Sequence, residues 1–114
     1  MGLMQRNKGK VWERKVAQRF RDVLPGVGIK RGWQTRNGAD APDVDVPTLW
    51  PECKHQRKCS PAAALRQAQT AEGAAGGGRI PIAVCKDNGQ DPFVVLDFDD
   101  FLELFGQWWA TRTQ

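Results

Sequence analysis

Several features of common protein classes are missing from this sequence. No apolar run approaches the roughly 18 residues that a membrane span needs. The N-terminal segment is basic but has no apolar core, so we expect no secretory signal and no membrane partner. The three cysteines are an odd number and form no Cys-x-x-Cys pair, which disfavours a disulfide framework. We therefore expect a protein of a reducing cytoplasm.

The glycine-rich segment 76–78 lacks the residue order of a nucleotide-binding loop. A phosphate-cradling loop ends in Gly-Lys-Ser or Gly-Lys-Thr before a helix. Here the glycines are followed by Arg79 and an apolar stretch. The segment is therefore predicted to be an ordinary connection from a helix to a strand.

The charge of the chain is distributed unevenly. The 114 residues carry a net charge of +4, with 40% hydrophobic and 26% charged residues, as in an ordinary globular domain. Residues 1–36 hold ten Lys or Arg against Glu13 and Asp22, whereas residues 87–114 hold six acidic residues against Arg112. Such a basic front half favours a polyanion, above all a nucleic acid, as partner.

Hydrophobic periodicity predicts one α/β domain over residues 1–114, with the element order α-β-β-β-α-β-β-α. Ser60 and Pro61 mark the start of the second helix, as N-cap and first helical residue. The expected helices cover residues 8–24, 61–75 and 99–111, and the expected strands cover 29–36, 43–46, 49–55, 80–86 and 93–98.

Glu13 interrupts the apolar face of the first helix. At about 100° per residue it falls in the same arc as Ala17, Phe20 and Leu24. Burial of an unpaired charge costs several kcal/mol. We therefore expect either a basic partner or a metal site beside Glu13.

The segment 43–54 predicts a second group of charges. Side chains alternate along a strand, so Asp43 and Asp45 are expected on one face, and Glu52 and Lys54 on one face of the next strand. A tight antiparallel pair would join these faces into a carboxylate cluster beside one lysine. A hard divalent cation such as Mg²⁺ prefers such oxygen ligands.

Pro42-Asp43 and Glu52-Cys53-Lys54 resemble the Asp and Glu-x-Lys elements of the PD-(D/E)XK nuclease superfamily. The inward Glu13 on a preceding helix is similar to the archaeal-type Holliday-junction resolvases and related small phage nucleases. The family core, α-β-β-β-α-β, matches residues 8–86, with one strand and one helix added. The resemblance thus implies a restriction-endonuclease-like fold, a bacterial or phage-infected cytoplasm, and DNA as substrate.

The resemblance also implies roles for individual residues. Asp43, Glu52 and the carbonyl of Cys53 would hold Mg²⁺, or Mn²⁺ as a substitute, with Glu13 completing the site. Lys54 would position the water that attacks the phosphodiester. Glu13, Asp43, Glu52 and Lys54 are therefore the candidate catalytic residues.

Some positions leave alternatives open. Asp45 competes with Asp43 as metal ligand, and we favour Asp43 because of the Pro-Asp match. Pro51 cannot donate a hydrogen bond, so its strand should be interrupted or lie at an edge. Gln67, on the next helix, is either a contact to the metal site or DNA, or an ordinary surface amide.

Basic residues near the proposed site are candidates for contacts to DNA phosphates, because backbone contacts supply most non-specific affinity. No module that reads bases in the major groove is visible, so recognition of DNA shape is expected. The candidates are Lys8, Lys10, Arg14, Arg31, Arg36, Arg57 and Lys58.

A zinc site is a weaker alternative. It would use Cys53, His55, Cys59 and Cys85, but the paired spacing typical of zinc ligands is absent. These cysteines are expected to fill the core. His55 is disfavoured as a general base, because strand alternation turns it away from Glu52 and Lys54.

Three functions remain. The first is a Mg²⁺-dependent endonuclease that cuts four-way DNA junctions, the second is a nuclease of the same chemistry for flaps, ends or duplex, and the third is a non-catalytic nucleic-acid-binding module. A homodimer is expected, because a junction is cut on two strands and the last helix is apolar around much of its girth.

Overall fold

The computed structural model describes residues 3–32 and 41–112, with the backbone alone for residues 3–6. The elements run in the predicted order. The helices are α1 (Leu3–Val23), α2 (Pro61–Ala74) and α3 (Phe98–Arg112), and the strands are β1 (Lys30–Arg31), β2 (Val44–Asp45), β3 (Leu49–Gln56), β4 (Ile80–Asp87) and β5 (Phe93–Val95).

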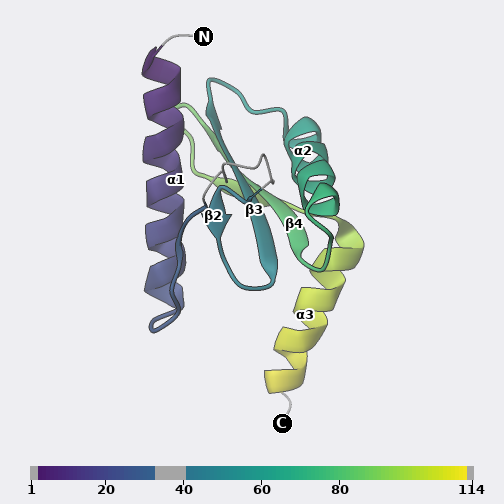
Figure 1. Cartoon of the computed structure of the whole chain (residues 1–114). Coiled ribbons are helices and arrows are strands. Elements are labelled where there is room, and N and C mark those ends of the chain that lie inside the picture. The colour runs from purple at the N-terminus through teal and green to yellow at the C-terminus, as the bar shows by residue number, and fades with distance from the viewer. Residues whose placement is uncertain (1–2, 33–40, 113–114) are drawn as a thin grey trace.

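The strands lie between two helices. β3 and β4 are parallel and β4 and β5 antiparallel, while β1 and β2 form a separate antiparallel pair. α1 covers one face of this layer and α2 the other, as Figure 1 shows. A parallel pair needs a long crossover, and α2 supplies it between β3 and β4. The prediction of a single α/β domain agrees with this architecture.

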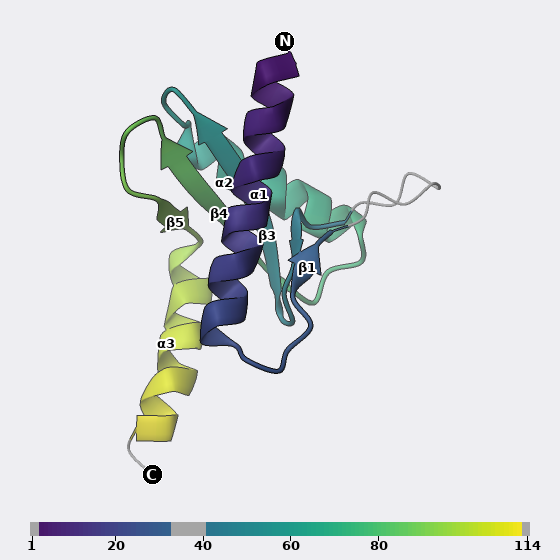
Figure 2. The same cartoon turned by 90° about the vertical axis from the view of Figure 1, so that its left-hand side faces the viewer.

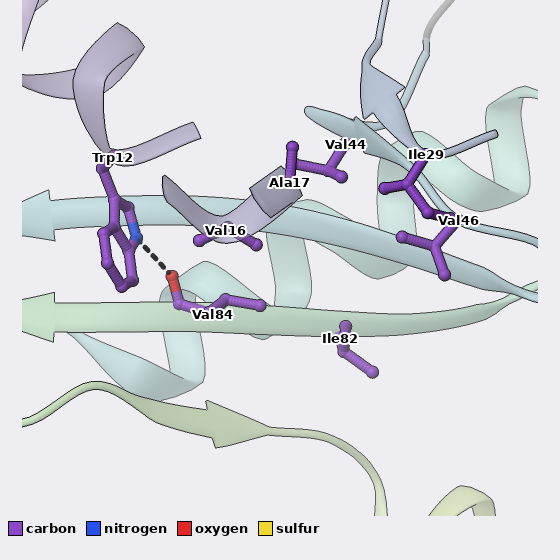
Figure 3. Packing of buried hydrophobic residues seen from close by; sticks show 8 residues of the cluster. All are labelled: Trp12, Val16, Ala17, Ile29, Val44, Val46, Ile82 and Val84. Atoms are coloured by element: carbon purple, nitrogen blue, oxygen red, sulfur yellow. Dashed lines mark hydrogen bonds between the residues drawn. The ribbon is translucent and has the colours of Figure 1, made fainter. Parts of the chain in front are cut away.

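The central strand β4 divides the core into two clusters. Ile82 and Val84 face α1, whereas Ala83 and Cys85 face α2, as the period of two requires. The cluster under α1 is the larger one and contains Trp12, Val16, Ala17, Ile29, Val44 and Val46 (Figure 3). The Trp12 indole N–H donates to the carbonyl of Val84 at 3.1 Å, which fixes α1 on the sheet.

The start of α2 differs in one detail from the prediction. Pro61 occupies the first turn and Ser60 the N-cap, but the Ser60 hydroxyl makes no capping hydrogen bond. The Ser60 carbonyl instead accepts the first helical N–H, from Ala64, at 2.9 Å. The helix ends as predicted before three glycines with positive φ, a conformation that glycine adopts without steric cost.

Pro51 does not interrupt β3, so that alternative was wrong. β3 pairs with β4 without a break from Leu49 to Gln56. The carbonyl of Pro51 accepts the N–H of Asp43 at 3.0 Å. Because N–H and C=O of one strand residue point to the same side, the missing donor faces the short β2 and not β4. The edge position predicted for Pro51 is therefore correct.

Three other elements are shorter or less enclosed than predicted. Of the expected strand 29–36, only Lys30–Arg31 is a strand, and residues 33–36 lie outside the described part. The expected strand 93–98 ends at Val95. No residue of α3 is buried, although the helix is apolar around much of its girth. In both views α3 extends away from the body of the domain (Figure 2).

None of the helices in the described ranges has the length and apolar character that a membrane crossing requires.

Candidate functional site

Asp43 lies directly before β2 and is bound to β3 by both its backbone and its side chain. Its N–H donates to the carbonyl of Pro51, and its Oδ2 accepts the N–H of Cys53 at 2.8 Å. The turn that makes this possible is tight, because Val46 and Leu49 already form an antiparallel bridge. Asp43 is thereby held beside the strand that carries Glu52 and Lys54.

Asp45 does not join this group, and the expectation that Asp43 and Asp45 share a face was wrong. β2 covers only Val44 and Asp45, and Asp43 lies in a bend before it, where strand alternation does not apply. Asp45 pairs instead with Arg79, whose Nη1 lies 3.0 Å from Oδ1. The structure therefore separates the two aspartates that the sequence left as alternatives.

Glu52 is a buried carboxylate between β3 and α2, with 8% of its surface exposed. Gln67 of α2 donates its Nε2 to Glu52 Oε1 at 3.0 Å. Gln67 is therefore more than a surface amide: it orients a candidate metal ligand. Lys54, two residues along the strand, lines a small hollow together with Gln67 and Ser60.

Glu13 has the basic partner that its position on α1 requires. Arg31 of β1 places Nη2 and Nε at 3.0 and 3.1 Å from Glu13 Oε1. The pair is partly exposed, with 23% of the Glu13 and 35% of the Arg31 side chain accessible. Of the two expectations for Glu13, the basic partner is therefore present in the structure.

Charges converge around Cys53. Burial raises the pKa of the Cys53 thiol far above its ordinary value, and the carboxylates of Asp43, Glu13 and Glu52 all add to the rise. The pKa of Asp43 is in turn affected by the charges of Glu13, Lys54 and Arg31. Three carboxylates and one lysine from α1, the β2–β3 hairpin and β3 thus surround one short stretch of strand.

No family model, curated protein or solved structure matches this chain. Its chemistry has to be inferred from these side chains and their surroundings.

The donor atoms around Cys53 are of the chemical type that a hard cation binds. Carboxylate and carbonyl oxygens are what Mg²⁺ prefers, and mutual repulsion of the carboxylates favours a cation between them. Within residues 3–32 and 41–112, however, no three His, Cys, Asp or Glu side chains are gathered closely enough to hold a metal ion. Glu13 in particular is engaged by Arg31.

A basic hollow adjoins the site. It has a volume of about 500 Å³, and its lining includes the basic side chains of Lys8, Lys54, Arg57 and Lys58. His55 also lines it, and the pKa of His55 is lowered by burial and then by the charges of Lys8, Lys86 and Lys15. Several positive charges are therefore concentrated at the end of β3.

The other phosphate-contact candidates are placed differently. Lys10 and Arg14 are exposed on α1, whereas the guanidinium of Arg31 is occupied by Glu13. Arg36 lies outside the described residues. The hollow therefore contains Lys8, Arg57 and Lys58 but not the whole predicted set.

The residues of the zinc alternative are dispersed. Cys53 packs against the larger core cluster, whereas Cys59 and Cys85 are buried in the smaller one. His55 stands edge-on to Trp12 with ring centroids 6.0 Å apart, on the α1 side of β3. This is the face opposite Gln67 and Glu52, as strand alternation predicts.

Two polar residues near the site have no signal in the sequence. Arg79 holds Asp45 although 34 residues separate them, and Asn88 accepts a hydrogen bond from Lys8 across 80 residues. Both contacts depend on the parallel pairing of β3 with β4. Only a model of the complete topology would have found them.

The protonation of Asp43 makes the stability of the fold depend on pH. Burial raises the pKa of Asp43 to about 6, with Glu13 adding to the rise and the hydrogen bond from Cys53 opposing it. In the unfolded chain this group loses its proton near its ordinary pKa of about 4. Between about pH 4 and pH 6 the native state therefore holds a proton that the unfolded state lacks, so stability falls as pH rises through this window.

We expect Asp43→Asn to be more stable than the parent by about 2–3 kcal/mol at pH 8, and equal to it near pH 4. The amide oxygen can still accept the Cys53 N–H, while the buried charge is removed. Urea unfolding in EDTA at both pH values measures the difference, with the exposed Asp91→Asn as control. A loss of stability at pH 8 would contradict this account of Asp43.

Proposed function

We propose that this chain is a Mg²⁺-dependent DNA endonuclease of the PD-(D/E)XK type, selective for branched DNA such as four-way junctions. The observation that carries the proposal is the convergence of Asp43, Glu52 and Lys54 with Glu13 beside a basic hollow. An acidic hairpin next to concentrated positive charge suits a phosphodiester substrate and a bridging cation.

The topology supports a restriction-endonuclease-like core. The elements of this core follow the α-β-β-β-α-β order of that family: α1, then β1, β2 and β3, then α2 and β4. The Pro-Asp element lies at the start of the hairpin, and the Glu-x-Lys element lies on β3, the strand parallel to β4. β5 and α3 are the additions that the sequence predicts.

In this proposal each side chain has one task. Asp43, Glu52 and the Cys53 carbonyl would hold the cation, with Glu13 completing the set once it is released from Arg31. Bound Mg²⁺, or Mn²⁺ in its place, would supply Lewis acidity and orient the reactants. Gln67 keeps the Glu52 carboxylate in position. Lys54 orients the attacking water and offsets negative charge that develops on the phosphate.

The reaction is hydrolysis of a phosphodiester. A water oxygen forms a bond to phosphorus and releases a proton to solvent, while the bond from phosphorus to the 3′ oxygen breaks and the departing oxygen takes up a proton from solvent. The products are a 3′ hydroxyl and a 5′ phosphate. The basic hollow holds the neighbouring backbone, since phosphate contacts position DNA without reading its sequence.

A second candidate is a nucleic-acid-binding module without catalysis. The observation in its favour is the Glu13–Arg31 pair, which engages a carboxylate that the nuclease requires. This module would use the same basic hollow, so DNA binding alone does not separate the two candidates. Cleavage does.

The decisive experiment is cleavage of labelled DNA with Mg²⁺. The protein is incubated with a panel of four DNA substrates, and a parallel series contains EDTA. The substrates are a four-way junction, a flap, a linear duplex with ends and a closed circular duplex. Junction cleavage that depends on Mg²⁺ supports the proposal. If another DNA of the panel is cut in preference, that DNA replaces the junction as the proposed substrate. Tight binding of all members without cleavage would favour the second candidate.

The hollow gives a prediction for binding alone. We expect Arg57→Ala to weaken the affinity for every DNA of the panel and to lower the slope of log K against log salt by about 1, because one phosphate contact is lost. Cleavage at saturating DNA should be unchanged. Arg19→Ala, which removes the same charge from α1 outside the hollow, is the matched control. Equal salt slopes for both variants would remove the hollow from the DNA interface.

A further inference from the structure

α3 presents an apolar surface to solvent. Six of its large side chains are between 46% and 71% exposed, and none of its residues is buried. The six, which we call the α3 stripe, are Phe98, Phe101, Leu102, Phe105, Trp108 and Trp109. A helix that only capped the core would turn these residues inward.

The exposed side chains of α3 lie on one face of the helix. At about 100° per residue, the α3 stripe falls within an arc of about 120°. Asp99, Glu103 and Gln107 lie on the opposite arc. The half-buried residues Leu104 and Asp100 lie to one side, and this side meets the rest of the domain. The stripe therefore points away from the body of its own chain.

The side chains of the stripe are ordered against one another. Phe105 is stacked with Phe101 at a centroid distance of 6.1 Å and contacts Trp108 at 5.6 Å. Arg112 lies over the Trp108 ring, 4.8 Å from its centroid. A surface of aromatic rings that is already ordered loses little conformational entropy when a partner covers it.

The area of the stripe matches a protein interface. A large aromatic side chain covers about 200 Å², so six half-exposed side chains expose roughly 600 Å². Soluble monomers rarely expose contiguous apolar patches of more than a few hundred Å². Two such stripes together bury about 1,200 Å², which reaches the range of stable interfaces.

We propose that the partner is a second copy of this chain, with the two α3 helices packed antiparallel about a two-fold axis at Phe105. In this register Phe105 faces its own copy, Leu102 faces Trp108 and Phe101 faces Trp109. The remaining pair is Phe98 with Arg112. The inference does not depend on the nuclease proposal.

Charge favours the antiparallel arrangement. The first turn of α3 carries Asp99 and Asp100, whereas its last turn carries Arg112. Antiparallel packing places Arg112 of each copy beside Phe98 of the other, at the end of α3 that carries the acidic turn, although Asp99 and Asp100 themselves lie outside the stripe. Parallel packing would place the acidic turns together and the two arginines together, which costs free energy. The pKa of Asp100 is already raised, by burial and then by Asp97, Glu103 and Asp99.

A competing site for the stripe lies on the same chain. An apolar groove of about 280 Å³ runs between α1 and β5, lined among others by Val16, Phe20, Phe93 and Val94. Side chains of the stripe from a second copy could enter this groove without any contact between the two α3 helices. The helix-to-helix arrangement is favoured because it pairs apolar side chains with one another in a single register and keeps the acidic first turns of the two helices apart.

Sedimentation equilibrium at micromolar concentration tests the interface. We expect a dimer for the parent chain, a monomer for Phe105→Glu, and a dimer for Gln107→Glu, which adds the same charge on the opposite arc. Val94→Glu, in the groove, should remain dimeric. Circular dichroism checks that each variant is folded. A monomeric parent, or a Phe105→Glu variant as dimeric as Gln107→Glu, would overturn the proposal, and so would dissociation by Val94→Glu.

Cysteine cross-linking tests the register of the two helices without any substitution that breaks the interface. A mixture of Phe98→Cys and Arg112→Cys chains should form a mixed disulfide dimer on mild oxidation, whereas Phe98→Cys alone should form far less. The natural thiols interfere little, since burial raises the pKa of Cys53, Cys59 and Cys85 and keeps them protonated. Cross-linking of Phe98→Cys with itself would indicate parallel helices and contradict the register.

Discussion

Glu52→Gln and Lys54→Ala are expected to lower DNA cleavage at least about 1,000-fold, while the protein remains folded. In the proposed mechanism Glu52 supplies charge that holds the cation, and the amide retains the size and the bond to Gln67 but not the charge. Lys54 is only partly buried, so its loss costs little packing. The measurement is the single-turnover cleavage rate on the preferred substrate of the panel with Mg²⁺.

Matched controls separate chemistry from folding. Glu72→Gln changes another buried carboxylate, one that accepts the N–H of Arg79 at 2.9 Å on the α2 side, away from Lys54. Lys30→Ala removes an exposed lysine from β1. Both controls should cleave within a few-fold of the parent. Near-normal cleavage by Glu52→Gln or Lys54→Ala would end the assignment of this site, whatever the protein binds.

Asp43→Asn should reduce cleavage at least about 100-fold, whereas Asp45→Asn should stay within about tenfold of the parent. Asp43 lies beside Cys53, Glu13 and Lys54, while Asp45 is held by Arg79 on the other side of the hairpin. The Asp45–Arg79 pair is partly exposed, and such pairs contribute about 0–1 kcal/mol. Cleavage rates and urea midpoints of both variants, measured at pH 8, give the comparison.

Stability and activity should move in opposite directions for Asp43→Asn. The variant is expected to gain stability at pH 8 and lose activity, which is the behaviour of a residue that serves function at the expense of the fold. Asp45→Asn should lose a little stability and little activity. A variant pattern in which Asp45→Asn is inactive and Asp43→Asn is active would transfer the metal-ligand role to Asp45.

The sequence predicts much of the frame because its local signals are strong. The Ser60-Pro61 start of α2 and the apolar run of β4 each define an element within a residue or two, whereas α1 begins at Leu3, five residues before the predicted start. The alternation of Glu52 and Lys54 against Cys53 and His55 is also correct, since a strand has a strict period of two.

Other features depend on contacts that no local pattern contains. The sequence required a partner for Glu13 but could not choose Arg31, because the choice depends on where β1 lies against α1. Strand alternation failed for Asp43 and Asp45 because Asp43 precedes the strand. The composition of α3 suggested an interface but could not decide against a core position, since an apolar stripe on a core helix and one at an interface have the same sequence pattern.

Asp43 has a further consequence for how the chain can change over evolutionary time. Its N–H and its carboxylate bind Pro51 and Cys53, so it fixes the register of β3 within the hairpin. A slip of one residue would turn Glu52 and Lys54 toward α1 and Cys53 and His55 toward α2. We therefore expect an insertion between residues 46 and 49 to disturb this register, whereas a change of length in the glycine segment 76–78 should leave it intact.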